Sequence, residues 1–322
     1  MTESDMDIFR RRFAKDFPKG TDLSLNGCRA AMNKIVVDIA KEMLPHAAST
    51  LGIQIGSFRD RLTNVEMVET PEVNGFAKSS DGWRTFQIGI NLGLMMFFHK
   101  MTKVFASVIG VMGEDGRPKE SPTIPFTEVV AASRRLVKAF WEERLMHEQG
   151  FQLVQLSDSQ ITMASMLLHY AESFTVAHEL GHIILNVSPQ VRAELTAGTG
   201  IVRGILEDIT GMNDGDKTRL VEKWGNEIAS DLLGLQLAIE HAKDSHKKVL
   251  IYSSVELVFL MQEILEAYLE KVAGTKPISD THPPSSFRLG SLRAAVRSGN
   301  PPQIFQIGEA FETLSEKIIE QI

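Results

Sequence analysis

Two histidines and a glutamate near the middle of the chain have the types and spacing of a metal-activated catalytic site. They stand in the segment His178-Glu179-Leu180-Gly181-His182, an H-E-x-x-H pattern. Residues four apart lie one turn apart on the same face of a helix, so His178 and His182 can direct both imidazoles to one zinc ion. The carboxylate of Glu179 projects about a quarter-turn away, where it can take a proton from metal-bound water. The pattern therefore predicts a zinc site with Glu179 as the general base.

The segment around this motif is also typical of a plain amphipathic helix that contains two histidines. Ser157 and Gln160 form an S-x-x-Q capping box, apolar residues follow at helical spacing, and Pro189 closes the segment. Both interpretations need this helix, so a third ligand has to decide between them.

A third ligand is indicated by the segment Trp224 to Leu235, WGNEIASDLLGL. Asp231 falls inside its apolar stripe, and Glu227 stands one turn earlier, so two like charges would repel each other on a partly buried face. Zinc bound by Glu227, with Asp231 accepting the free N–H of a ligand histidine, would offset both costs. Gly234 would let two helices pack closely beside them. The alternative is a solvated acidic edge on a surface helix.

This set of residues resembles the gluzincin metallopeptidases, in which two helix histidines and a distant glutamate bind zinc. In those enzymes an aspartate four residues after the glutamate supports a ligand histidine. The HtpX-type and CAAX-processing peptidases are the most similar, because their motif E-x-x-A-D matches Glu227 to Asp231 with Ser230 in place of alanine.

Further blocks of the chain match the same peptidases. They are Thr281-His282-Pro283-Pro284 followed by Arg288, and the upstream segments Pro71 to Ala77 and Ile90 to Leu94, with Gly75 in place of alanine. The resemblance implies that His282 lies beside the zinc as a second catalytic residue, where it can hydrogen-bond the oxyanion of the transition state. It also implies that Arg288 lies in the layer behind the ligands and that the upstream hairpin lies beside the histidine helix.

Two departures from the pattern prevent the substrate from being carried over. Those peptidases are typically membrane-embedded, whereas no segment of this sequence is long and apolar enough to span a bilayer. His178 also follows Leu94 by 84 positions, where a much shorter helical connection is usual. A soluble gluzincin with a D-T-H-P-P block is also similar to the Lit-type phage-exclusion peptidases, which act on a translation elongation factor.

Hydrophobic periodicity predicts an α+β fold that is mostly α, and the resemblance implies a gluzincin-like zincin core. Helical spacing runs through residues 30–44, 92–111, 126–148, 160–185, 217–242 and 255–272. Alternation between Asn64 and Asn91 predicts a small antiparallel sheet. Residues 113–125 are rich in glycine, proline and charge and predict an exposed loop. We expect an N-terminal helical segment at 1–63 and a metallopeptidase domain at 64–322, with a helical insertion at about 95–156.

One strand of the predicted sheet, Phe86 to Asn91, is expected to bind substrate. If it is an exposed edge, an extended peptide can add to it as a further β-strand. Phe86, Ile88 and Ile90 would face the core, and the opposite side would carry the substrate-binding positions Gln87, Gly89 and Asn91. Gly89 would let another backbone approach closely. This expectation depends on the hairpin lying beside the His178 helix.

Composition and charge exclude several classes of partner. The 322 residues carry 34 basic and 41 acidic side chains, a net charge of −7 that argues against nucleic-acid binding. The first residues show no apolar signal region, and Cys28 is the only cysteine, so no intrachain disulfide can form. We expect a cytoplasmic protein whose partner is a protein or peptide substrate, with no nucleic acid and no membrane-spanning segment.

These observations together predict a soluble endopeptidase that uses Zn²⁺ to hydrolyse peptide bonds by metal-activated water. The sequence has no G-x-M-E-N-type block that would capture a substrate amine, which disfavours an aminopeptidase. The rival from another class is a non-catalytic regulatory or scaffold protein that retains a zincin-like metal site. An intact Glu179 argues against that rival, because a purely structural site needs no carboxylate aimed at an open coordination position.

Overall fold

The computed structural model describes residues 25–68, 70, 74–108, 111–112, 118–120, 125–141, 156–196, 214–241, 245–274, 282–297 and 306–322. The helices are α2 (Leu25–Thr50), α3 (Ile55–Arg61), α4 (Leu92–Ser107), α5 (Phe126–Trp141), α6 (Asp158–Val187), α7 (Pro189–Thr196), α9 (Asp214–His241), α10 (Ser245–Ala273), α11 (Ser285–Arg297) and α12 (Gln306–Gln321). The strands are β1 (Leu62–Val68), β2 (Gly75–Lys78), β3 (Phe86–Asn91), β4 (Val111–Met112) and β5 (Pro118–Glu120). The predicted class, α+β and mostly α, is confirmed.

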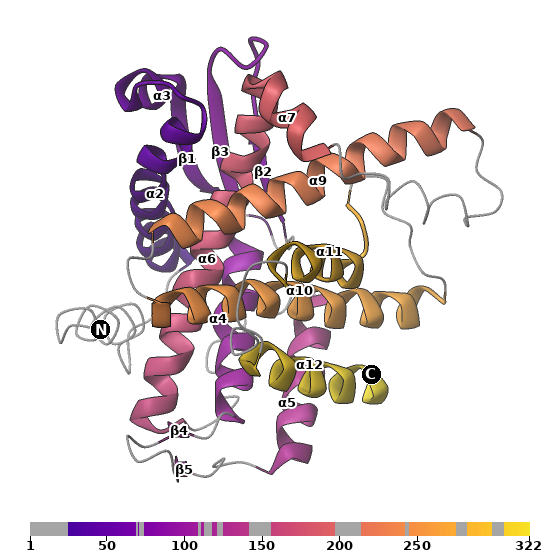
Figure 1. Cartoon of the computed structure of the whole chain (residues 1–322). Helices are drawn as coiled ribbons and strands as arrows, with labels where there is room; N and C mark the ends of the chain where they lie inside the picture. Colours follow the sequence, from indigo (N-terminus) through magenta and orange to yellow (C-terminus); the bar gives the residue numbers. More distant parts are fainter. Residues whose placement is uncertain are drawn as a thin grey trace.

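Helix α6 is the central element of the fold and carries the H-E-x-x-H motif. It packs against α2, α4, α9 and α10, and Figure 1 shows it running through the middle of the molecule. The predicted capping box begins it: Ser157 Oγ accepts from the backbone N–H of Gln160, and the Gln160 side chain accepts from the backbone N–H of Ser157. The Gln160 amide also donates to the carbonyl of Ser107 at 3.0 Å, which fixes the start of α6 against the end of α4.

Helices α6 and α9 cross at very short range because each has a glycine at the contact. A Cβ on Gly181 would lie 2.9 Å from the carbonyl oxygen of Ser230, and a Cβ on Gly234 would lie 2.9 Å from the backbone nitrogen of His178. Such distances are too short for a side chain, so both positions require glycine. The close packing predicted for Gly234 is confirmed, and it brings the two motifs of the sequence together.

The three-stranded sheet has the order β1-β3-β2, with β1 parallel and β2 antiparallel to β3. The prediction of a purely antiparallel sheet is therefore wrong. Alternation of apolar residues specifies the buried face of a strand but not the direction of its neighbours. The core-facing residues were predicted correctly, since Phe86, Ile88 and Ile90 are each at most 1% exposed.

The remaining predictions about organisation are tested only in part. Within the predicted loop at 113–125, the structure describes β5, which pairs in an antiparallel ladder with β4 just before the loop. Helix α2 packs against β1, α6 and α9, and α4 packs against α5 and α6. The boundary at residue 63 and the insertion at about 95–156 stay predictions. Among the described helices, none has the length and apolar character needed to cross a bilayer.

Candidate metal centre

Three side chains from α6 and α9 converge on one point. The Nε2 atoms of His178 and His182 lie 3.0 Å apart, and the Glu227 carboxylate lies 3.6 Å from the first and 3.4 Å from the second. Ligand atoms bound at about 2.0–2.1 Å around a tetrahedral zinc ion are separated by about 3.3 Å. The observed spacings are close to that value.

The donor set and its burial fit zinc. Two imidazole nitrogens and one carboxylate oxygen are the ligands of many catalytic zinc sites, in which a fourth position stays open. His178 and Glu227 are each 8% exposed, and Glu227 Oε2 is buried with no hydrogen-bond partner among the residues that the structure describes. A buried carboxylate oxygen without a hydrogen bond is costly, and a cation held between these three groups would compensate it.

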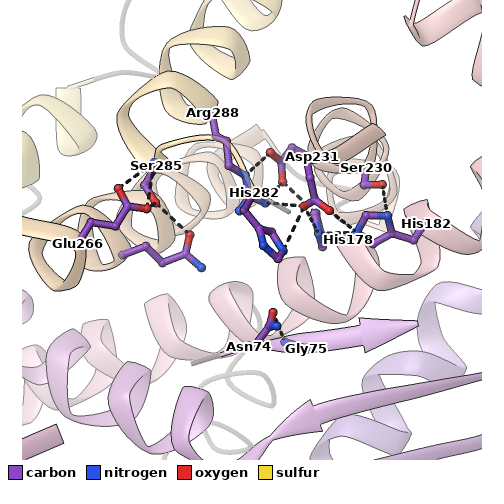
Figure 2. Close-up of polar contacts among 12 residues, drawn as sticks. Asn74, Gly75, His178, His182, Ser230, Asp231, Glu266, His282, Ser285 and Arg288 are labelled. Carbon is purple, nitrogen blue, oxygen red and sulfur yellow. Dashed lines mark hydrogen bonds and ion pairs between the residues drawn. The ribbon is translucent and has the colours of Figure 1, made fainter. Parts of the chain in front are cut away.

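Asp231 supports His178 and is itself held by Arg288. Its Oδ1 lies 2.9 Å from His178 Nδ1, on the side of the ring away from the point of convergence. Arg288 donates two hydrogen bonds to the same carboxylate, from Nε at 2.8 Å and Nη2 at 2.6 Å. Figure 2 shows Asp231 between the two partners. A chain of buried polar contacts thus runs from α11 through α9 to the first histidine.

The second histidine has a different partner. His182 Nδ1 lies 2.9 Å from the hydroxyl oxygen of Ser230, which is fully buried. Ser230 and Asp231 are neighbours on α9, and they contact histidines one turn apart on α6. Each imidazole therefore presents Nε2 to the common point and has its Nδ1 occupied from behind.

The carboxylate of Glu179 is packed against the backbone of β2. A Cβ on Gly75 would lie 2.7 Å from Glu179 Oε1, so the carboxylate occupies the space that a side chain would need. Glu179 is 4% exposed, and this burial raises its pKa to about 7. A carboxylate with a pKa near neutrality can both accept and return a proton.

His282 is described at the start of the segment that leads into α11. Its Nε2 lies 3.5 Å from Glu227 Oε2, and its side chain is 36% exposed. The first turn of α11 is anchored to α10, because Glu266 accepts hydrogen bonds from both the backbone N–H and the hydroxyl of Ser285. His282 and Arg288 therefore reach the cluster from the same anchored segment (Figure 2).

The ionisable groups of the cluster shift one another's pKa values. Burial alone would lower the pKa of His178, but its contacts with Asp231 and Glu227 raise it to about 10. Burial and the neighbouring His178 lower the pKa of His182 to about 4. Burial would raise the pKa of Asp231, yet the adjacent Arg288 guanidinium holds it below its usual value. The pKa values of these groups are thus coupled to one another through the contacts among His178, Asp231 and Arg288.

The structure contradicts the predicted substrate strand. Strand β3 is the central strand and is paired on both sides, with β1 through Gln87 and Gly89 and with β2 through the same residues. Asn91 is 3% exposed, and a Cβ on Gly89 would overlap the ring of Phe76. Gln87, Gly89 and Asn91 therefore offer no free edge to a peptide. The assignment was wrong because alternation does not tell which strand of a sheet lies at its edge.

The structure brings the other predicted site residues together, namely His178, Glu179, His182, Glu227, Asp231, His282 and Arg288. It also adds two that the sequence did not single out, Ser230 and Gly75. Both stand where the resembling peptidases have alanine, and that difference was the available signal. Comparisons of the chain with protein-family models, curated protein sequences and solved structures gave no match.

Proposed function

We propose that this protein is a zinc-dependent endopeptidase in which His178, His182 and Glu227 hold the metal and Glu179 is the general base. One observation carries the proposal: three ligand atoms of the right chemistry converge at 3.0–3.6 Å, and the buried carboxylate of Glu179 follows His178 directly on α6. A purely structural zinc site would have four protein ligands and would not need this additional carboxylate.

The reaction follows from the positions of these groups. When bound, zinc would lower the pKa of a water molecule and polarise the peptide carbonyl. Glu179 would accept the proton of the attacking water and deliver it to the leaving nitrogen as the C–N bond breaks. His282, half-exposed at the rim of the cluster, would donate a hydrogen bond to the carbonyl oxygen as it gains charge.

The peptide would bind along β2 rather than β3. Strand β2 is an edge of its sheet within the described part of the chain, and its first residue touches Glu179. Asn91 donates to the carbonyl of Asn74, so by the alternation of an antiparallel ladder Gly75 and Ala77 direct their main-chain groups to the free edge. Figure 2 shows Asn74 and Gly75 facing the polar cluster. An extended substrate added there would pass beside the general base.

The first test is metal content. The purified chain should hold about one zinc ion, and Glu227→Ala should hold much less, because it removes one of three ligands. Elemental analysis after gel filtration measures both. Equal zinc in the two proteins would remove Glu227 from the ligand set and end the proposal in this form.

The second test separates catalysis from metal binding. Glu179→Gln should keep its zinc and its fold but lose several orders of magnitude in cleavage of a randomised fluorogenic peptide mixture, because an amide cannot accept the proton. If the wild type and Glu179→Gln both bound zinc and neither cleaved any peptide, the result would favour the non-catalytic scaffold.

A further inference from the structure

Ser230 occupies a position that no ligand assignment requires. It lies between Glu227 and Asp231 in sequence, it is fully buried, and its hydroxyl oxygen is 2.9 Å from His182 Nδ1. The resembling peptidases have alanine here and so have no hydroxyl at this point. The contact is therefore a property of this chain rather than of the motif.

The direction of this hydrogen bond follows from the chemistry of imidazole. Neutral histidine has one N–H and one nitrogen lone pair, so only one of its nitrogens can bind a metal while the other donates. His182 Nε2 faces His178 and Glu227, at 3.0 and 3.4 Å, which makes it the metal-facing nitrogen. Nδ1 must then carry the proton, and the oxygen of Ser230 is placed to accept it.

We infer that Ser230 is a positioning residue, which holds His182 in the tautomer and ring orientation that a metal ion needs. The inference rests on the proposed zinc site, but it does not depend on proteolysis. The helix crossing makes the contact possible, because Gly181 lets the backbone of Ser230 approach between the two histidines. The two ligand histidines are thus supported in different ways, His178 by a carboxylate and His182 by a hydroxyl.

A hydroxyl suits this position better than a second carboxylate. Glu179, Glu227 and Asp231 already place three carboxyl groups in a buried site that contains one guanidinium, Arg288. A further carboxylate would have no guanidinium of its own and would repel those already present. Serine fixes the ring without adding charge.

The experiment compares Ser230→Ala with a matched control in the metal-free full chain. Ser254→Ala serves as control, because Ser254 is also fully buried in a helix and its hydroxyl bonds the carbonyl of Leu250 on its own helix, α10. Zinc affinity is measured by competition with a chromophoric chelator. We expect Ser230→Ala to bind zinc about 10- to 100-fold more weakly than the wild type, and Ser254→Ala to bind it within about twofold.

A spectroscopic readout tests the tautomer directly. In ¹⁵N-edited NMR spectra of the zinc-loaded wild type, His182 should show a slowly exchanging Nδ1–H proton, and in Ser230→Ala this signal should broaden or disappear. The wild-type spectrum is a test on its own, because metal bound through Nδ1 of His182 would overturn the inference.

The outcomes separate the two proposals. Unchanged zinc affinity and an unchanged Nδ1–H signal in Ser230→Ala would overturn the role of Ser230 and leave the zinc site intact. A wild-type chain that binds zinc no better than Glu227→Ala would overturn both the inference and the proposed function. Weaker binding in Ser230→Ala alone, with the control unaffected, supports the role of Ser230.

Discussion

The carboxylate of Glu179 is positioned by the absence of a side chain. Gly75 leaves open the space in which Glu179 Oε1 lies, and a Cβ at this position would also lie 3.1 Å from Cδ1 of Ile90. The carboxylate end of a glutamate is flexible, so an added methyl group would displace it without disturbing the backbone. Gly75 therefore determines where the proposed general base lies.

Gly75→Ala should reduce peptide cleavage by about 10- to 100-fold while the zinc content and melting temperature stay close to those of the wild type. The expected loss is large because small misplacements of a catalytic group are costly. Steady-state kinetics with the fluorogenic peptide mixture, together with zinc analysis of the same sample, measure it.

A double-mutant cycle shows whether this effect passes through Glu179. In the background of Glu179→Gln, where proton transfer is already lost, Gly75→Ala should have little further effect. Additive losses would mean that Gly75 acts on substrate binding instead. Gly56→Ala is a control substitution, because a Cβ at Gly56 meets nothing within 4 Å.

The proposed ligands and Asp231 were predictable from the sequence, whereas the contacts of Ser230 and Gly75 were not. His178 and His182 share one helix, so the spacing alone defines their common face, and Asp231 was indicated by its place in an apolar stripe. The contacts of Ser230 with His182 and of Gly75 with Glu179 join different elements. They depend on how closely α6 approaches α9 and β2, which the spacing of residues within a single helix does not specify.

At the scale of elements, the order of the strands decides which strand could bind the proposed peptide substrate. Strands β2 and β3 are antiparallel neighbours, and β1 pairs with the opposite side of β3, so β2 is an edge strand and lies beside α6. The alternation that predicted β3 correctly as a strand carried no information about this order. The glycine that suggested close approach of a substrate, Gly89, instead accommodates the ring of Phe76.

Ala77→Pro should abolish or strongly reduce peptide cleavage without loss of zinc. Ala77 directs its N–H to the free edge, so proline removes a donor to the substrate and spares the ladder to β3. Peptide kinetics and zinc analysis on the same preparation measure the two effects.

Ala77→Ser is the matched control, because it keeps the N–H at the same position and should retain most of the activity. If the proline variant cleaved peptides at the wild-type rate, substrate binding along β2 would be excluded, and the metal site would be unaffected by that result.

At the scale of the whole molecule, the cluster is connected to the C-terminal helix through α11. Arg288 on α11 donates hydrogen bonds to Asp231. Arg293, also on α11, donates to Glu256 of α10 at 2.6 Å and to Glu312 of α12 at 2.8 Å. The proposed zinc ligands thus lie within one continuous packed body. Any loss of global stability should therefore also be seen as loss of metal binding.

Acid should destabilise this body through a histidine outside the proposed zinc site. His99 lies on α4 and is 8% exposed, and burial together with the nearby Lys103 and Lys100 holds its pKa well below 6.5. The folded chain therefore keeps His99 neutral at a pH where the unfolded chain protonates it. Unfolding takes up a proton below about pH 6.5, so the free energy of unfolding falls as pH decreases there and does not depend on His99 above it.

His99→Gln should flatten this pH dependence, because glutamine keeps a polar side chain but cannot be protonated. We expect the wild type to lose up to about 1.4 kcal/mol more than the variant for each pH unit below 6.5. Urea denaturation at pH 5.5 and 7.5, with a chelator present so that zinc release does not contribute, measures the difference. Ser254→Ala, which alters a buried side chain that does not titrate in this range, is the control and should keep the pH dependence of the wild type. Parallel pH dependences of the wild type and His99→Gln would show that His99 accepts its proton in the folded state and that the interior around α4 tolerates the charge.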